Sequence, residues 1–183
     1  CTDSLYLIGT GNGLFQSRDA GTYKEIYEPA LSNQRLSIGN INAVFSDSLG
    51  RIWIGTVAGL NIWDIRQNKV FIPPLSGGGR SRVSSSYISS IQKGYGSDLW
   101  IGTWGGGLYR ARSGQIETEK IHLEFIADLN GQLAMGKNEI WALYENELSR
   151  YNFNTGKVEN VIIPEDLKSG IRLSSITCSG NDI

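Results

Sequence analysis

Short apolar runs alternate along the chain with turns rich in glycine, aspartate and asparagine. The clearest stretch holds four such runs, at Ile41–Phe45, Arg51–Thr56, Leu60–Ile65 and Lys69–Ile72. Runs of this length between turn residues are typical of β-strands in antiparallel sheets. No segment shows a long apolar period of 3.6 residues, and at most one helical turn is expected, at 165–168. The pattern therefore predicts an all-β chain.

The same unit returns along the sequence. It is a short strand with an aromatic residue near its start, followed by a turn and, in the first three copies, by a Gly-Leu pair. The aromatic residue falls at Tyr6, Trp53 and Trp100 and, in a divergent fourth copy, at Trp141. The spacings are 47, 47 and 41 residues. Strand-rich periods of about 40 to 50 residues indicate the blades of a β-propeller.

A single four-stranded sheet leaves two faces to bury, and stacking sheets around an axis buries them. We therefore expect the four aromatic residues of the repeat to fill the space between blades. The fold class predicted for residues 1–183 is a β-propeller fragment of about four blades, each a four-stranded antiparallel sheet. The expected boundaries are 1–32 (a partial blade), 37–76, 84–124, 125–164, and 171–183 as the first strand of a next or split blade.

Composition narrows the possible partners and chemistry. The 17 Lys and Arg residues against 18 Asp and Glu residues give a net charge of −1, which argues against a nucleic-acid partner. No apolar run is long enough for a membrane helix and no signal peptide is recognised, so membrane contact is expected only through other parts of a longer protein. Cys1 and Cys178 are either two inert thiols or one disulfide, and the sequence leaves this open.

The residues give no sign of an enzyme. His122 is the one histidine, the acidic residues are scattered through turns, and no nucleophile has a partner base. We therefore expect no catalytic residues, no metal site and no cofactor in this segment.

Residues 41–64, INAVFSDSLGRIWIGTVAGLNIWD, closely resemble the two-component regulator propeller repeat, and residues 87–110 fit it too. Such repeats occur in the extracytoplasmic sensor region of hybrid two-component histidine kinase and response regulator proteins of Bacteroidetes. The resemblance implies a periplasmic, non-catalytic sensor propeller of a signalling receptor, and many such receptors respond to glycan fragments. The kinase motifs themselves are missing from this segment.

Ligands on a propeller bind through its loops. The turns between second and third strands share a face with the linkers between blades, and Trp104 lies unusually in such a turn. The candidate ligand residues on this face are Trp104, Asn12, Arg35, Arg80, Arg82, Tyr87, Asn146 and Arg172. Stacking on Trp104 with hydrogen bonds from its polar neighbours suits an oligosaccharide. Alternatively, Trp104 only covers the end of the propeller.

Two other functions stay open: a fragment of a propeller glycoside hydrolase or lyase, and a non-catalytic interaction scaffold. The exposed strand edges of a propeller fragment invite pairing. We expect either closure of the chain on itself, with 174–177 against Leu5–Ile8, or self-association into a dimer through these edges.

Overall fold

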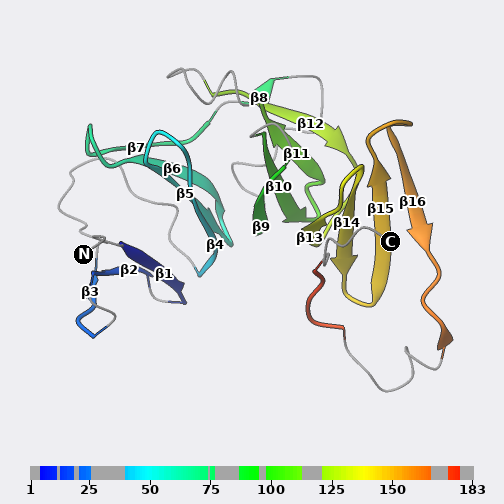
Figure 1. The fold of residues 1–183 in the computed structure, drawn as a ribbon, viewed down its shortest axis with the longest axis horizontal. Helices are drawn as coiled ribbons and strands as arrows, with labels where there is room; N and C mark the ends of the chain where they lie inside the picture. Colours follow the sequence, from blue (N-terminus) through cyan, green and yellow to red (C-terminus); the bar gives the residue numbers. More distant parts are fainter. Residues whose placement is uncertain are drawn as a thin grey trace.

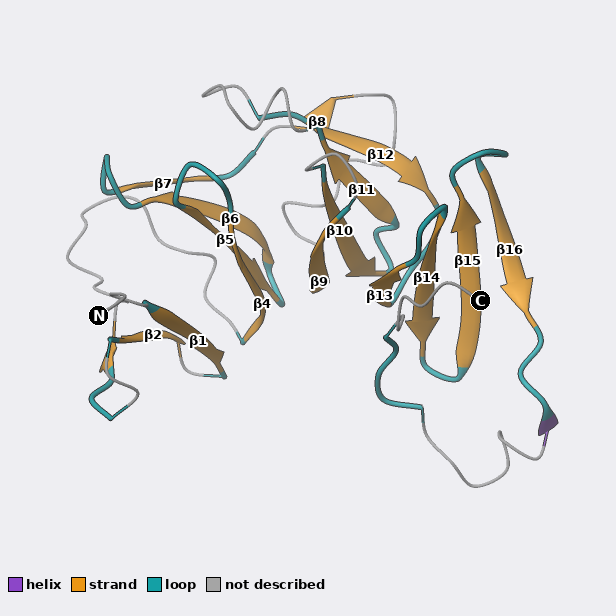
Figure 2. Ribbon diagram, viewed as in Figure 1, coloured by secondary structure: helices purple, strands orange, loops and turns teal. Residues whose placement is uncertain are grey.

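The computed structural model describes residues 5–11, 13–18, 21–25, 40–73, 75–76, 87–94, 98–112, 121–165 and 173–177. Their strands form four separate sheets that stand side by side in an open arc (Figures 1 and 2). Within each sheet, strands that follow one another in sequence pair in an antiparallel way, except that β8 of the third sheet does not pair with β9. The predicted all-β propeller fold is confirmed.

Each sheet is one blade, and its first strand along the chain lies at one edge. Blade one contains β1 (Tyr6–Thr10), β2 (Gly13–Ser17) and β3 (Lys24–Glu25). Blade two contains β4 (Ile41–Ser46), β5 (Arg51–Thr56), β6 (Gly59–Asp64) and β7 (Lys69–Phe71). Blade three contains β8 (Leu75–Ser76), β9 (Tyr87–Lys93), β10 (Leu99–Trp104), β11 (Leu108–Ala111) and β12 (Leu123–Ala127). Blade four contains β13 (Gln132–Met135), β14 (Glu139–Tyr144), β15 (Glu147–Asn152) and β16 (Lys157–Val161).

Blade three is larger than expected at its outer edge. β8 pairs in parallel with β12, so residues 75–76 belong to this sheet and not to blade two. β12 also continues to Ala127, which pairs with Leu108 of β11. Residues 75–76 and 125–127 thus lie in the sheet of blade three.

The core lies between blades. Trp53 in blade two is completely buried in one cluster with residues of blade three such as Ile88 and Tyr109. Trp100 in blade three is 5% exposed and stacks on Phe153 of blade four, with ring centroids 5.3 Å apart. Each tryptophan thus points toward the blade that follows it in the chain, and the predicted packing is confirmed for these two residues.

Tyr6 does not hold the position predicted for it. Gly9 pairs with Leu14 just as Gly55 pairs with Leu60 in blade two, so the residue equivalent to Trp53 is Leu7. Successive side chains of a strand point to opposite faces, and a shift of one residue therefore moves Tyr6 to the outer face of blade one. There it is 51% exposed. An alignment of the repeat copies on their aromatic residue is therefore wrong by one position in blade one, whereas an alignment on the Gly-Thr pair gives the observed register.

Trp141 has the same place in its sheet as Trp100 but is only partly buried. It points away from blade three, toward a side where the described residues place no further sheet. The Arg150 guanidinium covers its ring at 5.8 Å, and its Nε1–H donates to Glu139 Oε1 at 2.7 Å. The prediction that Trp141 is buried between two blades is therefore wrong for the described residues.

The motif glycine explains how closely the blades approach. A Cβ atom added at Gly55 would lie 2.5 Å from Cγ2 of Ile88, on the first strand of the next blade. One added at Gly102 would lie 2.7 Å from the carbonyl oxygen of Gly131, directly before the first strand of blade four. Only glycine leaves room for this contact.

The two ends of the described chain do not close a ring. β1 pairs with β2 alone among the described strands, and residues 173–177 form no strand. Those residues lie beside blade four, on the other side of the arc from β1, and Leu173 N donates to Asn146 Oδ1 at 3.2 Å (Figure 1). The predicted pairing of 174–177 with Leu5–Ile8 is wrong, because each segment is attached to the blade next to it in sequence.

Candidate functional site

Three aromatic side chains gather where second strands end in blades three and four. Trp104, the last residue of β10, is 42% exposed and stacks on Tyr87, with centroids 4.6 Å apart and ring planes 8° from parallel. Tyr144, the last residue of β14, meets Trp104 edge-on at 6.2 Å. We call Tyr87, Trp104 and Tyr144 the aromatic shelf.

The structure places Trp104 at the end of a strand and not in a turn as predicted, and the turn that follows it is fixed by side-chain hydrogen bonds. Thr103 Oγ1 donates to Gly107 O at 2.7 Å and accepts from Gly106 N at 2.9 Å. Asn130 Oδ1 accepts from Gly105 N at 3.0 Å and from Gly107 N at 2.9 Å. Gly105 and Gly107 have φ of 90° and 91°, a conformation that other residues rarely adopt. The shelf is therefore set in place by the protein, before any ligand arrives.

The shelf is also tied to blade two. The Tyr87 hydroxyl donates to Asn42 Oδ1 at 3.4 Å, and Asn42 Nδ2 donates to Ile88 O at 3.1 Å. Asn42 thus holds the stacked tyrosine from the neighbouring blade. The shelf and its support span three successive blades. The binding of a ligand to the shelf would therefore depend on how these blades are positioned relative to one another.

The structure brings some of the predicted ligand residues together. Trp104 and Tyr87 are in direct contact, and Asn146 lies in the turn between β14 and β15, two residues after Tyr144. Asn12, Arg35, Arg80, Arg82 and Arg172 lie outside the described residues.

Sequence reasoning missed Tyr144 and Asn42. Tyr144 replaces the threonine of the motif in the worn fourth copy, and its place in the repeat was the available signal. Asn42 looked like an ordinary residue of a first strand.

The side chains of the shelf are of types that can bind a ligand non-covalently. Aromatic faces with adjacent amide and hydroxyl groups suit ligands that present both apolar faces and hydroxyls. Among the described residues, no group of three or more His, Cys, Asp or Glu side chains could hold a metal ion. The described part of the chain also has no helix long and apolar enough to cross a membrane.

The fold and the shelf together define a β-propeller segment with an exposed, preformed aromatic surface at the ends of its strands. Residues 35–58 match the family model described as two component regulator propeller, which confirms the resemblance inferred from the repeats. The comparison with curated proteins finds no matching sequence.

Solved structures share the fold. The extracellular domain of a hybrid two-component system from B. thetaiotaomicron is 20% identical, with a TM-score of 0.65 over 87% of this chain and 24% of that one. A second such domain from the same organism is 16% identical, with a TM-score of 0.66 over 88% of this chain and 23% of that one. Virginiamycin B lyase from Staphylococcus aureus is 16% identical, with a TM-score of 0.57 over 89% and 53% of the two chains. This chain thus spans about a quarter of the length of the two-component relatives.

Proposed function

We propose that this chain is part of the extracytoplasmic sensor region of a two-component signalling receptor, and that the aromatic shelf binds an oligosaccharide. The repeat match and the fold shared with extracellular domains of hybrid two-component systems support the receptor class. The observation that carries the site is Trp104, exposed at the end of β10 and followed by a turn that hydrogen bonds hold in place.

A saccharide suits this surface for physical reasons. The C–H faces of a sugar ring are apolar and stack on the face of an aromatic ring, while its hydroxyls need donors and acceptors at the edges. Trp104 is more exposed than either tyrosine of the shelf, and Tyr87 braces its ring from one side. Because the ring is already held, little conformational entropy is lost when a ligand stacks on it.

Calorimetric titration of the protein with a panel of oligosaccharides tests the site. Trp104→Ala should weaken the binding of any active oligosaccharide at least fivefold, since one aromatic contact is worth about 1 kcal/mol or more. The matched control is Tyr23→Ala, which removes an aromatic side chain that is 53% exposed on blade one. Equal binding by wild type and Trp104→Ala would show that the shelf is not the site.

The shared fold with virginiamycin B lyase favours a second candidate, a propeller hydrolase or lyase. The same panel separates the two, because product analysis by mass spectrometry detects cleavage of any oligosaccharide. A sensor returns every oligosaccharide intact, and turnover would replace the receptor proposal with the enzyme. A periplasmic location follows from the receptor class and is tested by cell fractionation of the whole protein.

A further inference from the structure

The first strands of blades two and three each contain one extra residue. In β4 the register against β5 skips Asn42, and in β9 the register against β10 skips Ser89. Both bulges lie opposite the Gly-Thr pair of the second strand, so they have the same place in the repeat. A β-bulge turns a side chain out of the regular alternation of a strand. We call Asn42 and Ser89 the bulge residues.

Both bulge residues donate a hydrogen bond to the main chain of the next blade. Asn42 Nδ2 donates to Ile88 O in blade three at 3.1 Å. Ser89 Oγ donates at 2.5 Å to Gly131 O, directly before the first strand of blade four. Ser89 is 7% exposed, so its bond lies buried in the joint between these blades. The bulges therefore aim one polar side chain across each of two successive joints.

The contact from blade two extends to the ring of Trp104. The Tyr87 hydroxyl donates to Asn42 Oδ1 at 3.4 Å, so the amide of Asn42 holds both Tyr87 and the carbonyl group of the residue after it. Tyr87 in turn stacks on Trp104, with ring planes 8° from parallel. Because Tyr87 covers one face of the Trp104 ring, its position decides how the other face is presented.

The contact from blade three extends to the main chain around Trp104. Gly131 donates its N–H to Thr103 O at 2.8 Å, immediately before Trp104. The neighbouring Asn130 accepts from Gly105 N at 3.0 Å, immediately after Trp104. The linker to blade four thus holds the chain on both sides of the tryptophan, and the bulge residue of β9 holds the linker.

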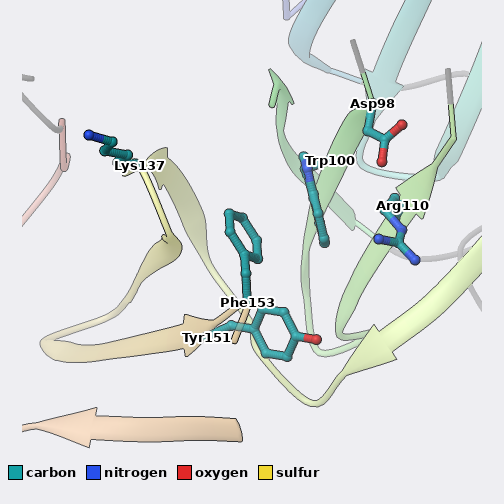
Figure 3. Close-up of a pocket in the computed structure, with 6 residues that line it drawn as sticks. All are labelled: Asp98, Trp100, Arg110, Lys137, Tyr151 and Phe153. Atoms are coloured by element: carbon teal, nitrogen blue, oxygen red, sulfur yellow. The ribbon is translucent and has the colours of Figure 1, made fainter. Parts of the chain in front are cut away.

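The joint between blades three and four is not closely packed along its whole length. A cavity of about 230 Å³ lies near the start of β10, at the opposite end of that strand from Trp104, and its lining residues are Asp98, Trp100, Arg110, Lys137, Tyr151 and Phe153 (Figure 3). Apolar contact at that end has no preferred direction, whereas a hydrogen bond requires a defined geometry. The hydrogen bonds at the shelf end therefore fix how the two blades meet there.

We propose that Asn42 and Ser89 are positioning residues of the shelf, through which the joints between blades two, three and four set the position of the Trp104 ring. This role rests on the proposed binding function of the shelf and deepens it, because it makes that function depend on the joints. A movement of blade two or blade four would reach the ring to which the ligand binds. By reciprocity, a ligand that fixes the ring would hold the three blades together.

Fluorine NMR of the protein labelled with 5-fluorotryptophan tests this role without any ligand. The chain has five tryptophans, and Trp104→Phe identifies the Trp104 signal. Asn42→Ala and Tyr87→Phe should each shift that signal toward its position in Tyr87→Ala, where the stacked ring is absent. Because both changes remove the same hydrogen bond to the tyrosine hydroxyl, Tyr87→Phe should add little to the shift in the double variant. Ser89→Ala, which releases the linker, should also shift the Trp104 signal.

The matched control is Asn160→Ala, which removes an exposed asparagine of β16 that accepts from Ser149 Oγ at 2.8 Å. It should leave the Trp104 signal in place. The signals of Trp53 and Trp100, in the cores on either side of blade three, should stay in place in Asn42→Ala.

An unchanged Trp104 signal in Asn42→Ala and Tyr87→Phe would overturn the proposal, and so would an equal shift in Asn160→Ala. If the Trp53 and Trp100 signals move as much as the Trp104 signal, Asn42 supports the packing as a whole and has no particular role at the shelf. No ligand is present in these spectra, so their outcome is independent of whether the shelf binds an oligosaccharide.

Discussion

The turn between β4 and β5 depends on one buried carboxylate, and its removal should destabilise the protein strongly. Asp47 is 3% exposed and accepts from Arg51 Nε at 2.7 Å and from Trp53 Nε1 at 3.0 Å. It also accepts from the backbone N–H groups of Leu49 and Arg51, both at 3.0 Å. One side chain thus closes the turn, neutralises a buried arginine and holds the tryptophan that fills the space between blades two and three.

Asp47→Ala leaves the Arg51 guanidinium, only 6% exposed, without its carboxylate. Removing one partner of a buried ion pair costs about 3–5 kcal/mol, a large part of the 5–15 kcal/mol that stabilises an ordinary domain. Urea unfolding followed by tryptophan fluorescence measures the change. The double variant Asp47→Ala/Arg51→Met should recover much of the loss, because it also removes the buried guanidinium that Asp47 neutralises.

Asn152→Ala is the matched control. Asn152 Oδ1 accepts two backbone N–H groups, from Asn154 at 2.9 Å and Thr155 at 3.1 Å, but holds no buried cation. Its removal should cost only about 1 kcal/mol. If Asp47→Ala destabilises the protein no more than Asn152→Ala does, the buried ion pair has no special role and this reasoning is refuted.

Three further changes probe the packing between blades and the surface ion pairs. Gly55→Ala places a Cβ 2.5 Å from the first strand of the next blade and should cost about 1–3 kcal/mol in a thermal melt, whereas Gly11→Ala, with its nearest atom at 3.4 Å, should be near neutral. Hydrogen bonds from Arg110 and a second arginine lower the pKa of Glu124 from 4.5, so its contribution to stability is present above that pH and is lost as the pH falls through the lowered value. In Glu124→Gln, the free energy of unfolding measured by urea titration should therefore fall less between about pH 5 and pH 2 than in wild type. An identical fall in both proteins would contradict this. Trp100→Ala should cost about 3–5 kcal/mol, and a loss below about 1 kcal/mol would argue against its role in the core.

The sequence predicted the structure well at positions where the residue type serves a single structural purpose in this fold. The repeated motif predicted the strands and the burial of Trp53 and Trp100 between blades, where the structure has them. Tyr6 and Trp141 show the limit of the pattern, because the burial of an aromatic residue also depends on its register and on a neighbouring sheet. Neither the register nor the presence of a neighbouring sheet follows from the sequence of the strand alone.

The candidate site was predictable only in part. Trp104 stood out because it directly precedes a run of glycines and has no core to fill. Its contacts with Tyr87 and Tyr144 depend on how the ends of three strands from two blades meet, which spacing along the chain does not give. The cavity beside Trp100 was not foreseen at all, since it arises from the shape left between two packed sheets.

The most direct test of the central proposal is signalling by the whole receptor in cells. A reporter gene under its control should be induced by an oligosaccharide that binds the shelf, and Trp104→Ala should abolish or strongly reduce that induction while protein levels stay unchanged. The Tyr23→Ala receptor should respond like wild type. Full induction in the Trp104→Ala receptor, at equal protein level, would contradict the proposal that this surface senses the ligand.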